Sequence, residues 1–374
     1  MNNKQSVTSR QNGSVHGRLP GSEPSDSFII GPDDRILVTG ATGFIGSRVV
    51  ESLVDRGFHN VVCFARPSSD LSKLEAGVKN QPSGTRIEVL RGNLLSRADC
   101  EAASKGASVI YHLAAGTGEK SFPDAFMNSV VTTRNLLEAT TQHACLKRFV
   151  VVSSLAVYSN RQRSRRLDES CPVEPHPEHS GSAYCYAKVK QEQIVSELSK
   201  KFAIPYVTVR PGSVYGPGHA EITARVGIRA FGPFLHFGGF NSIPFTYVDN
   251  CAEAIVLAGL ISGVEGEIFN VMDDDTPSSR SFLKMYKQNV RAFKSAYVPH
   301  MFSYALCYLW EKYAEYSEGQ LPPAFNRRRW YAEWRPTTYS NTKLKQRLGW
   351  KHKVSTSEAL RIYFNSCAEG GQRA

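Results

Sequence analysis

Two tyrosine–lysine pairs stand in the segment SAYCYAKVKQE, residues 182–192. Lys188 follows Tyr184 by four positions, and Lys190 follows Tyr186 in the same way. Residues four apart on an α-helix share one face, about 6 Å apart along the axis. A phenol has a reference pKa of about 10, and a nearby ammonium group lowers that pKa. One pair could therefore exchange a proton with a substrate hydroxyl; the alternative for either pair is packing and a solvated helix face.

A glycine-rich turn near the start of the chain has the pattern of a dinucleotide cradle. The segment RILVTGATGFIGSRVVESLVDRG, residues 35–57, reads as strand, turn and helix. Gly40, Gly43 and Gly46 let the backbone turn tightly and approach a pyrophosphate at the amino end of the helix. The apolar run that follows, NVVCFAR, supplies the second strand of a βαβ unit. The segment therefore predicts a dinucleotide-binding unit.

The end of that second strand usually distinguishes NAD from NADP. A carboxylate there accepts a hydrogen bond from the ribose 2′-hydroxyl, whereas an arginine can bind a 2′-phosphate. Arg66 stands at this place, 20 positions after Gly46. We therefore favour NADP(H), with NAD(H) as the alternative and Asp70 as the residue that would support it. A solvated loop arginine is the plainer reading of Arg66.

The first half of the chain continues as alternating strands and helices. The run RIEVLRGNL ends at Asn93 and Leu94, and ASVIYHLAAGTG closes on Ala114 and Ala115. A helix, NSVVTTRNLLEATTQHA, and a further apolar strand, RFVVVSSLAVYS, follow. This alternation predicts an α/β fold with a doubly wound parallel (Rossmann) sheet, whose strand ends face a ligand crevice.

An ordered set of motifs resembles a known family. The motifs are TGATGFIG, HLAA, NSVVTTRNLLEA, FVVVSSLAVYS, YCYAK, VRPGSVYGPG, FTYVDNCAEAIVLA and LKQRLGW. In this order they resemble the extended short-chain dehydrogenases/reductases of the NAD(P)-dependent epimerase/dehydratase kind. The resemblance covers roughly Asp34 to Tyr363 and implies an NAD(P)-dependent oxidoreductase.

The resemblance also distinguishes the two tyrosine–lysine pairs. The family pattern continues with a glutamate four residues after the lysine, which Glu192 provides for Lys188, whereas Ile194 stands there for the other pair. It implies that Tyr184 exchanges the hydroxyl proton while hydride passes to or from the cofactor. Lys188 would also hold the nicotinamide ribose.

The remaining site residues are implied in the same way. Ser154 would orient the reacting oxygen, and Asn128 would support the site by hydrogen bonding. The cofactor-binding set that we expect comprises Gly40, Thr42, Gly43, Phe44, Ile45, Gly46, Arg66, Asn93, Leu94, Ala114, Ala115, Tyr184, Lys188 and Pro211.

The chain divides into three parts by composition and motif. Residues 1–30 are polar and predict a disordered tail. Residues 31–215 would form the NAD(P)-binding Rossmann domain, and residues 216–374 a smaller carboxyl-terminal substrate lobe. The resemblance implies that this lobe is partly interleaved with the main sheet, for example through IFNV, residues 268–271.

The second half leaves the substrate open. The approach NSIPFTYVDN is uncharged and resembles that of 3β-hydroxysteroid or sterol dehydrogenases. Four phenylalanines would suit an apolar alcohol or ketone, and the aromatic residues 297–310 would form part of a cover over it; packing within the lobe is the alternative. The phenylalanines are Phe231, Phe234, Phe237 and Phe240.

Two other functions remain as alternatives to the oxidation or reduction of an apolar substrate. Arg225 and Arg229, four apart, and the cluster 327–329 could hold a diphosphate, so a nucleotide-sugar epimerase or dehydratase with bound NAD is the alternative enzyme. A non-catalytic dinucleotide-binding sensor is a third reading, which the presence of the serine, tyrosine and lysine disfavours.

Composition limits the partners. The 374 residues carry a formal charge of +11, from 45 basic and 34 acidic residues, but no basic stripe is interleaved with stacking aromatics, so no nucleic acid is expected. The eight cysteines are scattered, which favours reduced thiols in the cytoplasm and no metal site. The apolar segment 296–310 is too short to span a bilayer and leaves a peripheral membrane contact open. A homodimer is expected.

Overall fold

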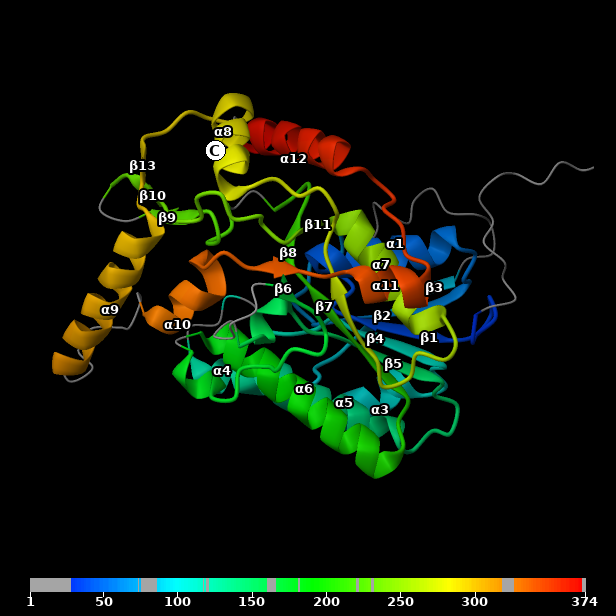
Figure 1. The fold of residues 1–374 in the computed structure, drawn as a ribbon. Helices are drawn as coiled ribbons and strands as arrows, with labels where there is room; N and C mark the ends of the chain where they lie inside the picture. The colour runs from blue at the N-terminus through cyan, green and yellow to red at the C-terminus, as the bar shows by residue number, and fades with distance from the viewer. Residues whose placement is uncertain are drawn as a thin grey trace, which may run out of the picture.

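The computed structural model describes residues 28–72, 74, 86–116, 118, 121–159, 166–180, 182–219, 222–229, 232–317 and 326–371. A seven-stranded parallel sheet with the order β12-β7-β5-β4-β1-β2-β3 lies at its centre (Figure 1). The strands are β1 Ile36–Thr39, β2 Asn60–Ala65, β3 Arg86–Arg91, β4 Val109–His112, β5 Arg148–Val152, β7 Tyr206–Pro211 and β12 Ile268–Val271.

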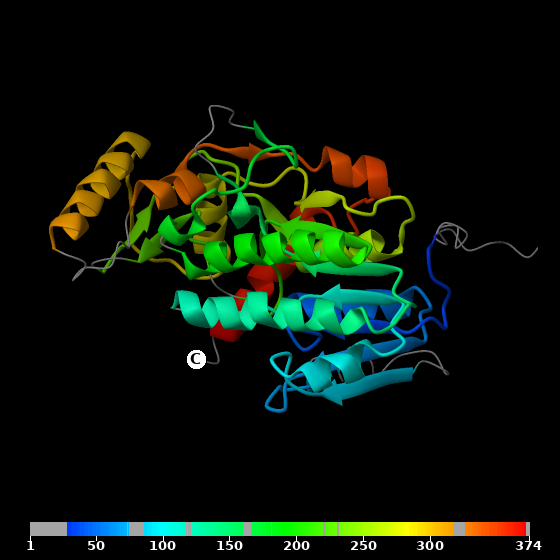
Figure 2. The ribbon, with the colours of Figure 1, turned by 90° about the horizontal axis from the view of Figure 1, so that it is seen from below.

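Helices cover both faces of this sheet. One face carries α1 Phe44–Asp55, α7 Val248–Leu260 and α11 Thr342–Leu348, and the other carries α3 Arg97–Ser104, α5 Thr132–Thr140 and α6 Ala183–Phe202 (Figure 1). Figure 2 shows α5 and α6 running side by side across the second face. The doubly wound α/β prediction is therefore confirmed.

The position of each strand in the sheet determines how far its residues are buried. The three strands β1, β4 and β5 are buried at every position, because helices cover both of their faces. The edge strand β3 instead has exposed positions along its length. The strand order reverses between β1 and β4, and in such a sheet ligands bind at the carboxyl ends of the strands beside that point.

A smaller lobe lies at one end of the sheet. It has an aromatic core and a three-stranded sheet, which consists of β13 Ser295–Tyr297, β10 Phe234–His236 and β9 Gly227–Arg229 in that order. Phe282 lies at the centre of that core, with its ring centroid 4.9 Å from Phe245 and 5.8 Å from Phe364. The later half of the chain also returns to the main sheet, because β12 pairs with β7 at its edge.

The lobe and the connecting segments contain the remaining elements. They are α4 Phe122–Ala125, β6 Arg166–Leu167, β8 Ser213–Tyr215, β9 Gly227–Arg229, β10 Phe234–His236, β11 Phe245–Tyr247, α8 Ser279–Asn289, β13 Ser295–Tyr297, α9 His300–Tyr316, α10 Arg327–Arg329, β14 Thr338–Tyr339 and α12 Thr356–Gly371. Two π-helical segments, Phe126–Val131 and Trp330–Trp334, and two 3-10 segments, Leu155–Val157 and Pro177–His179, complete the list.

The last three residues of the expected disordered tail, residues 28–30, are ordered in the structure. Residues 1–27 lie outside the described part of the chain, but Phe28, Ile29 and Ile30 are placed. The Ile29 amide donates to the Leu260 carbonyl at 2.9 Å, and Ile30 is buried in the core under α1 and α7. The apolar side chains of these three residues separate them from the polar sequence before them, because burial of apolar surface stabilises an ordered position.

Candidate active site

Lys188 is the buried cation of the site. The helix α6 begins after Ser182, whose hydroxyl accepts from the Cys185 amide, and it places Lys188 Nζ 6.0 Å from the centroid of the Tyr184 ring. Lys188 Nζ donates to the Val152 carbonyl at 2.7 Å and to Gln191 Oε1 at 3.0 Å. Burial lowers the pKa of Lys188 to about 8, and the charge of Glu192 acts in the opposite direction.

A buried chain of hydrogen bonds continues from Gln191. Its Nε2 donates to Thr133 Oγ1 at 2.9 Å, and His112 Nε2 lies 2.8 Å from the same oxygen. Thr133 gives its only hydroxyl proton to the Ser129 carbonyl, so both nitrogens must donate to it. His112 is therefore the Nε2–H tautomer, and its bare Nδ1 accepts from Thr39 Oγ1 at 2.8 Å.

The His112 imidazole in this series of hydrogen bonds is neutral. Burial first, and the charge of Lys188 second, lower the pKa of His112 to about 3. Thr39 Oγ1 also accepts from the Ala114 amide at 3.3 Å. The polar contacts thus extend without a break from the end of β4 to the Lys188 ammonium.

Tyr184 lies beside Ser154 at the other end of the site. Burial raises the pKa of the Tyr184 phenol, while a hydrogen bond with the Ser154 side chain lowers it. Burial outweighs the serine, and Lys188 does not contribute the expected lowering of this pKa. Ser154 itself caps the short 3-10 segment Leu155–Val157 and accepts from the Ala156 amide at 3.2 Å.

The second tyrosine–lysine pair has different surroundings. The Tyr186 ring packs edge-on against Phe122, with centroids 5.2 Å apart, and also contacts Phe126. Lys190 is partly exposed on the same helix. Neither residue of this pair lines the cavity that contains Ser154 and Tyr184.

Glu192 forms an ion pair with Arg210. Two nitrogens of Arg210 donate to the two carboxylate oxygens at 2.9 and 2.6 Å, and both side chains are largely buried. The Arg210 guanidinium also lies over the Tyr158 ring, 4.8 Å from its centroid. Glu192 therefore joins α6 to β7 and leaves Lys188 without a carboxylate in contact among the described residues.

The glycine turn fits a dinucleotide. Gly40 has φ of +72°, and a Cβ there would stand 2.9 Å from the Ala114 amide. A Cβ on Gly46 would stand 2.0 Å from the Gly40 carbonyl oxygen. Both positions accept only glycine, since the strand end and the helix approach so closely. The exposed Gly43 lies between them, so the backbone there is open to a pyrophosphate.

The other predicted cofactor residues lie at the carboxyl edge of the sheet. Arg66, Asn93 and Ala114 follow the ends of β2, β3 and β4, and Arg66 and Asn93 are exposed. Asp70 is also exposed and accepts from the Ser72 amide at 2.9 Å. The rest are Thr42, Phe44, Ile45 and Ala115, which are partly buried, and Leu94 and Pro211, which are buried. Asn128 is exposed in the π-helical segment Phe126–Val131.

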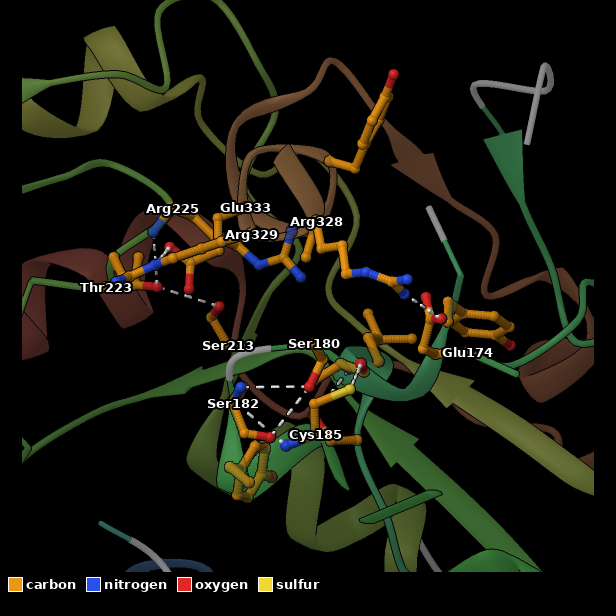
Figure 3. Close-up of a pocket in the computed structure, with 18 of the residues that line it drawn as sticks. Glu174, Ser180, Ser182, Cys185, Ser213, Thr223, Arg225, Arg328, Arg329 and Glu333 are labelled. Atoms are coloured by element: carbon orange, nitrogen blue, oxygen red, sulfur yellow. Dashed lines mark hydrogen bonds and ion pairs between the residues drawn. The ribbon is translucent and has the colours of Figure 1, made fainter. Parts of the chain in front are cut away.

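A cavity of about 570 Å³ contains Ser154 and Tyr184. Figure 3 shows Arg225, Arg328 and Arg329 on one side of it, facing Ser182 and Cys185 at the start of α6. Arg328 pairs with Glu174 at 2.9 Å and Arg329 with Glu333 at 3.1 Å. Arg225 forms no ion pair with a described carboxylate; its guanidinium lies over the Tyr339 ring.

A second cavity, of about 810 Å³, shares Ser213, Thr223 and Ala224 with the first. Arg229 and Arg291 line it, together with aromatic residues of the lobe such as Phe293. Arg229 lies on the strand β9, and Arg225 and Arg229 line adjoining cavities.

The phenylalanines and the aromatic segment differ from their expected roles. Phe234 and Phe237 are buried in the lobe, which fits the packing alternative, although Phe234 also borders the second cavity. Phe240 is exposed on the surface, and Phe231 lies outside the described residues. No residue of β13 or α9 lines the Tyr184 cavity, so the expected cover over the substrate is wrong. The buried face of α9 packs on Trp330 and Trp334 instead.

The location of several residues in the site was not predictable from a sequence pattern. Gln191 stands three positions after Lys188, but glutamine at that spacing is common on any helix. Glu174, Arg328 and Glu333 reach the cavity from segments far apart in the chain. Their shared location follows only from the tertiary fold.

A family model described as the NAD dependent epimerase/dehydratase family matches residues 36–271. The chain belongs to this family. The predicted membership, with its Rossmann fold and enzymatic character, is confirmed. The choice between NAD and NADP is not decided by this match.

Relatives within the family have different activities in their names. An uncharacterized UDP-glucose epimerase, YtcB of Bacillus subtilis strain 168, is 31% identical over 253 residues, covering 63% of this chain and 76% of its own. The dTDP-D-glucose 4,6-dehydratase of Bos taurus is 26% identical over 294 residues, covering 75% and 78%. A 3 beta-hydroxysteroid dehydrogenase/Delta 5-->4-isomerase of Mycobacterium tuberculosis is 33% identical over 192 residues, covering 49% and 48%.

Solved structures share the fold. A UDP-glucuronic acid 4-epimerase from Bacillus cereus in complex with NAD has a TM-score of 0.65 and 24% identity, covering 90% of this chain and 99% of its own. The structure of gox2253 has a TM-score of 0.72 and 23% identity, covering 91% and 99%.

The buried ammonium of Lys188 predicts a specific pH dependence. Its pKa of about 8 means that the charge is present below that pH and is lost above it. If this charge promotes proton exchange at Tyr184, kcat/KM falls as pH rises through about 8. Lys188→Arg keeps its charge throughout this range, so the variant should be slower but should lack that fall. The same alkaline fall in both proteins would show that another group titrates.

Proposed function

We propose that the chain is an NAD(P)-dependent oxidoreductase that acts on a secondary alcohol or ketone through Ser154, Tyr184 and Lys188. The observation that carries the proposal is the contact of Tyr184 with Ser154 in a cavity, next to a buried Lys188 ammonium. The nicotinamide, when bound, donates or accepts a hydride. The Tyr184 hydroxyl gives a proton to the substrate oxygen when a ketone is reduced, and the Tyr184 phenolate takes the proton when an alcohol is oxidised.

The other residues act on this proton exchange. Ser154 donates a hydrogen bond to the reacting oxygen and orients it. The Lys188 ammonium favours the phenolate form of Tyr184 by its charge. The glycine turn and the carboxyl ends of β1 and β4 hold the cofactor, and the exposed Arg66 favours a cofactor with a 2′-phosphate. Asn128 supports the same edge from the π-helical segment.

The cavities favour an elongated, anionic substrate. Arg225, Arg229 and Arg291 line the two adjoining cavities, and none of them pairs with a carboxylate among the described residues. A phosphate group would supply that missing charge with charge-assisted hydrogen bonds. The aromatic wall of the second cavity would suit a flat ring system. A nucleotide sugar has these parts in this order, so we propose a nucleotide sugar as the substrate.

An apolar secondary alcohol is the second candidate. The segment before β11 contributes buried Ile243 and no cation, and the approach resembles the sterol dehydrogenases. The sequence favours this candidate through its phenylalanines. The burial of Phe234 and Phe237 in the lobe weakens that support.

Replacement of Tyr184 tests the proposed chemistry. Tyr184→Phe should keep the fold and the cofactor affinity, since the ring still packs, but should lower kcat by about 10² to 10⁴, the usual contribution of general acid–base catalysis. Tyr186→Phe is the matched control two positions away and should keep near-normal turnover. A fast Tyr184→Phe enzyme beside an inactive Tyr186→Phe enzyme would show that the other pair is the catalytic one.

Replacement of Arg66 tests the cofactor. The wild-type protein should bind NADP(H) more tightly than NAD(H), and Arg66→Asp should reverse this order, because the carboxylate repels a 2′-phosphate and accepts from a hydroxyl. Isothermal titration of both cofactors into both proteins measures it. A wild-type preference for NAD(H) would refute the argument from Arg66 and favour Asp70.

A ligand screen tests the substrate class. Only a ligand of the folded state raises the thermal midpoint of the cofactor-loaded protein. We expect UDP- or dTDP-sugars to raise it, and Arg225→Ala or Arg229→Ala to reduce the shift. Arg97→Ala, at an exposed position on α3, is the control and should leave the shift unchanged. Stabilisation by sterols or long-chain hydroxy acids alone would establish the apolar candidate instead.

A further inference from the structure

The helix α9 exposes an apolar face that the proposed reaction does not use. Figure 1 shows it projecting from the lobe, away from the seven-stranded sheet. We define the outer face of α9 by its exposed apolar side chains: Met301, Phe302, Leu306, Tyr308, Leu309, Tyr313 and Tyr316. Met301 is 82% exposed and Phe302 68%. Contiguous exposed apolar surface of this kind marks an interaction site.

The opposite side of α9 fixes the helix to the lobe. Ser303, Cys307 and Ala314 are buried there, and Trp330 Nε1 donates to Ser303 Oγ at 2.8 Å. Arg327 pairs with Glu311 at 2.9 Å. The outer face is therefore presented by a helix whose other side is already packed, so rotation of α9 could not bury it.

The apolar surface continues beyond the helix. Tyr297, just before α9, is exposed, and its hydroxyl would stand 3.1 Å from a Cβ added at Gly239. Phe240, which follows Gly239 in the chain, is 73% exposed. The Arg280 guanidinium lies 5.2 Å from the Phe240 ring centroid. An apolar strip with a basic residue at its edge thus extends over both segments.

The segment that leads into α9 is basic. From residue 276 to residue 310 the sequence has no Asp or Glu and has five basic residues: Arg280, Lys284, Lys287, Arg291 and Lys294. The two glutamates of α9, Glu311 and Glu315, are each paired with a cation, Arg327 and Lys312. All but Lys287 are exposed. Lys294 lies three residues before Tyr297, so a positive charge stands at this end of the strip as well.

We infer that the outer face of α9 binds the surface of an anionic lipid membrane. Apolar and aromatic side chains would enter the headgroup boundary, the tyrosines would keep their hydroxyls in water, and Arg280 and Lys294 would meet lipid phosphates. No helix among the described residues is long and apolar enough to cross a bilayer, so the contact lies on the surface. The inference does not depend on the substrate.

A second copy of the chain fits the same face less well. Phe302, Leu306, Leu309, Tyr313 and Tyr316 follow each other at steps of four and three, which also suits helix pairing. A symmetric pair would, however, bring the same basic edge of each copy together, and like charges repel. An anionic membrane has the complementary charge.

Vesicle co-sedimentation of the full chain tests the inference. We expect binding to phosphatidylcholine vesicles that contain phosphatidylglycerol, weaker binding to phosphatidylcholine alone, and a decrease with salt. The double variant Phe302→Ser/Leu309→Ser should bind on the order of tenfold more weakly. Phe202→Ser, at an exposed site on α6, is the control and should bind normally. Arg280→Gln/Lys294→Gln should reduce the difference between the two vesicle types.

The results distinguish an anionic membrane from a second copy of the chain as the partner of this face. Equal thermal midpoints of the variants and the wild type show that weaker binding is not caused by unfolding. Absence of binding to both vesicle types, or equal binding by Phe302→Ser/Leu309→Ser, overturns the inference. Sedimentation velocity identifies the second copy: a wild-type dimer that Phe302→Ser/Leu309→Ser converts to monomer, without vesicle binding, would assign the face to that partner.

Discussion

The constraint on which the candidate site depends is a lysine ammonium buried without a contacting carboxylate among the described residues. Removing a charge from water is costly unless its protons find acceptors. Lys188 finds the Val152 carbonyl and the Gln191 side chain, while Glu192, which could have neutralised it, is bound by Arg210. The ammonium is therefore held by dipoles, and its pKa is low for a lysine.

The parallel sheet supplies the groups that satisfy this cation. The Val152 carbonyl is available because β5 ends there, and Thr39 and His112 stand at the ends of β1 and β4. Each hydrogen bond in the chain from Lys188 through Gln191 to Thr133 has a fixed direction, so the buried network has one arrangement of protons. The edge of the sheet that carries the glycine turn is thus connected to the helix that carries Tyr184.

Sequence reasoning worked where a pattern is local. The glycine turn, the alternating elements and the spacing of Tyr184 and Lys188 are set by neighbours in the chain, and the structure places the predicted elements and brings Tyr184 and Ser154 together. The pair of Arg328 with Glu174 joins residues 154 positions apart, and no local spacing encodes it. The segment 296–310 was expected to cover the substrate, and only the fold shows that one side of α9 packs on the lobe while the other is exposed.

The two tyrosine–lysine pairs show how one spacing can have two meanings. Consecutive residues of an α-helix are turned by about 100°, so Tyr184 and Tyr186 point to nearly opposite sides of α6. Once Lys188 is fixed to Val152, Tyr184 faces Ser154 and the cavity, and Tyr186 must face away. Phe122 and Phe126 complete that other side with an aromatic contact. The position of β5 against the helix, not the spacing of the pair, therefore determines which phenol faces the cavity.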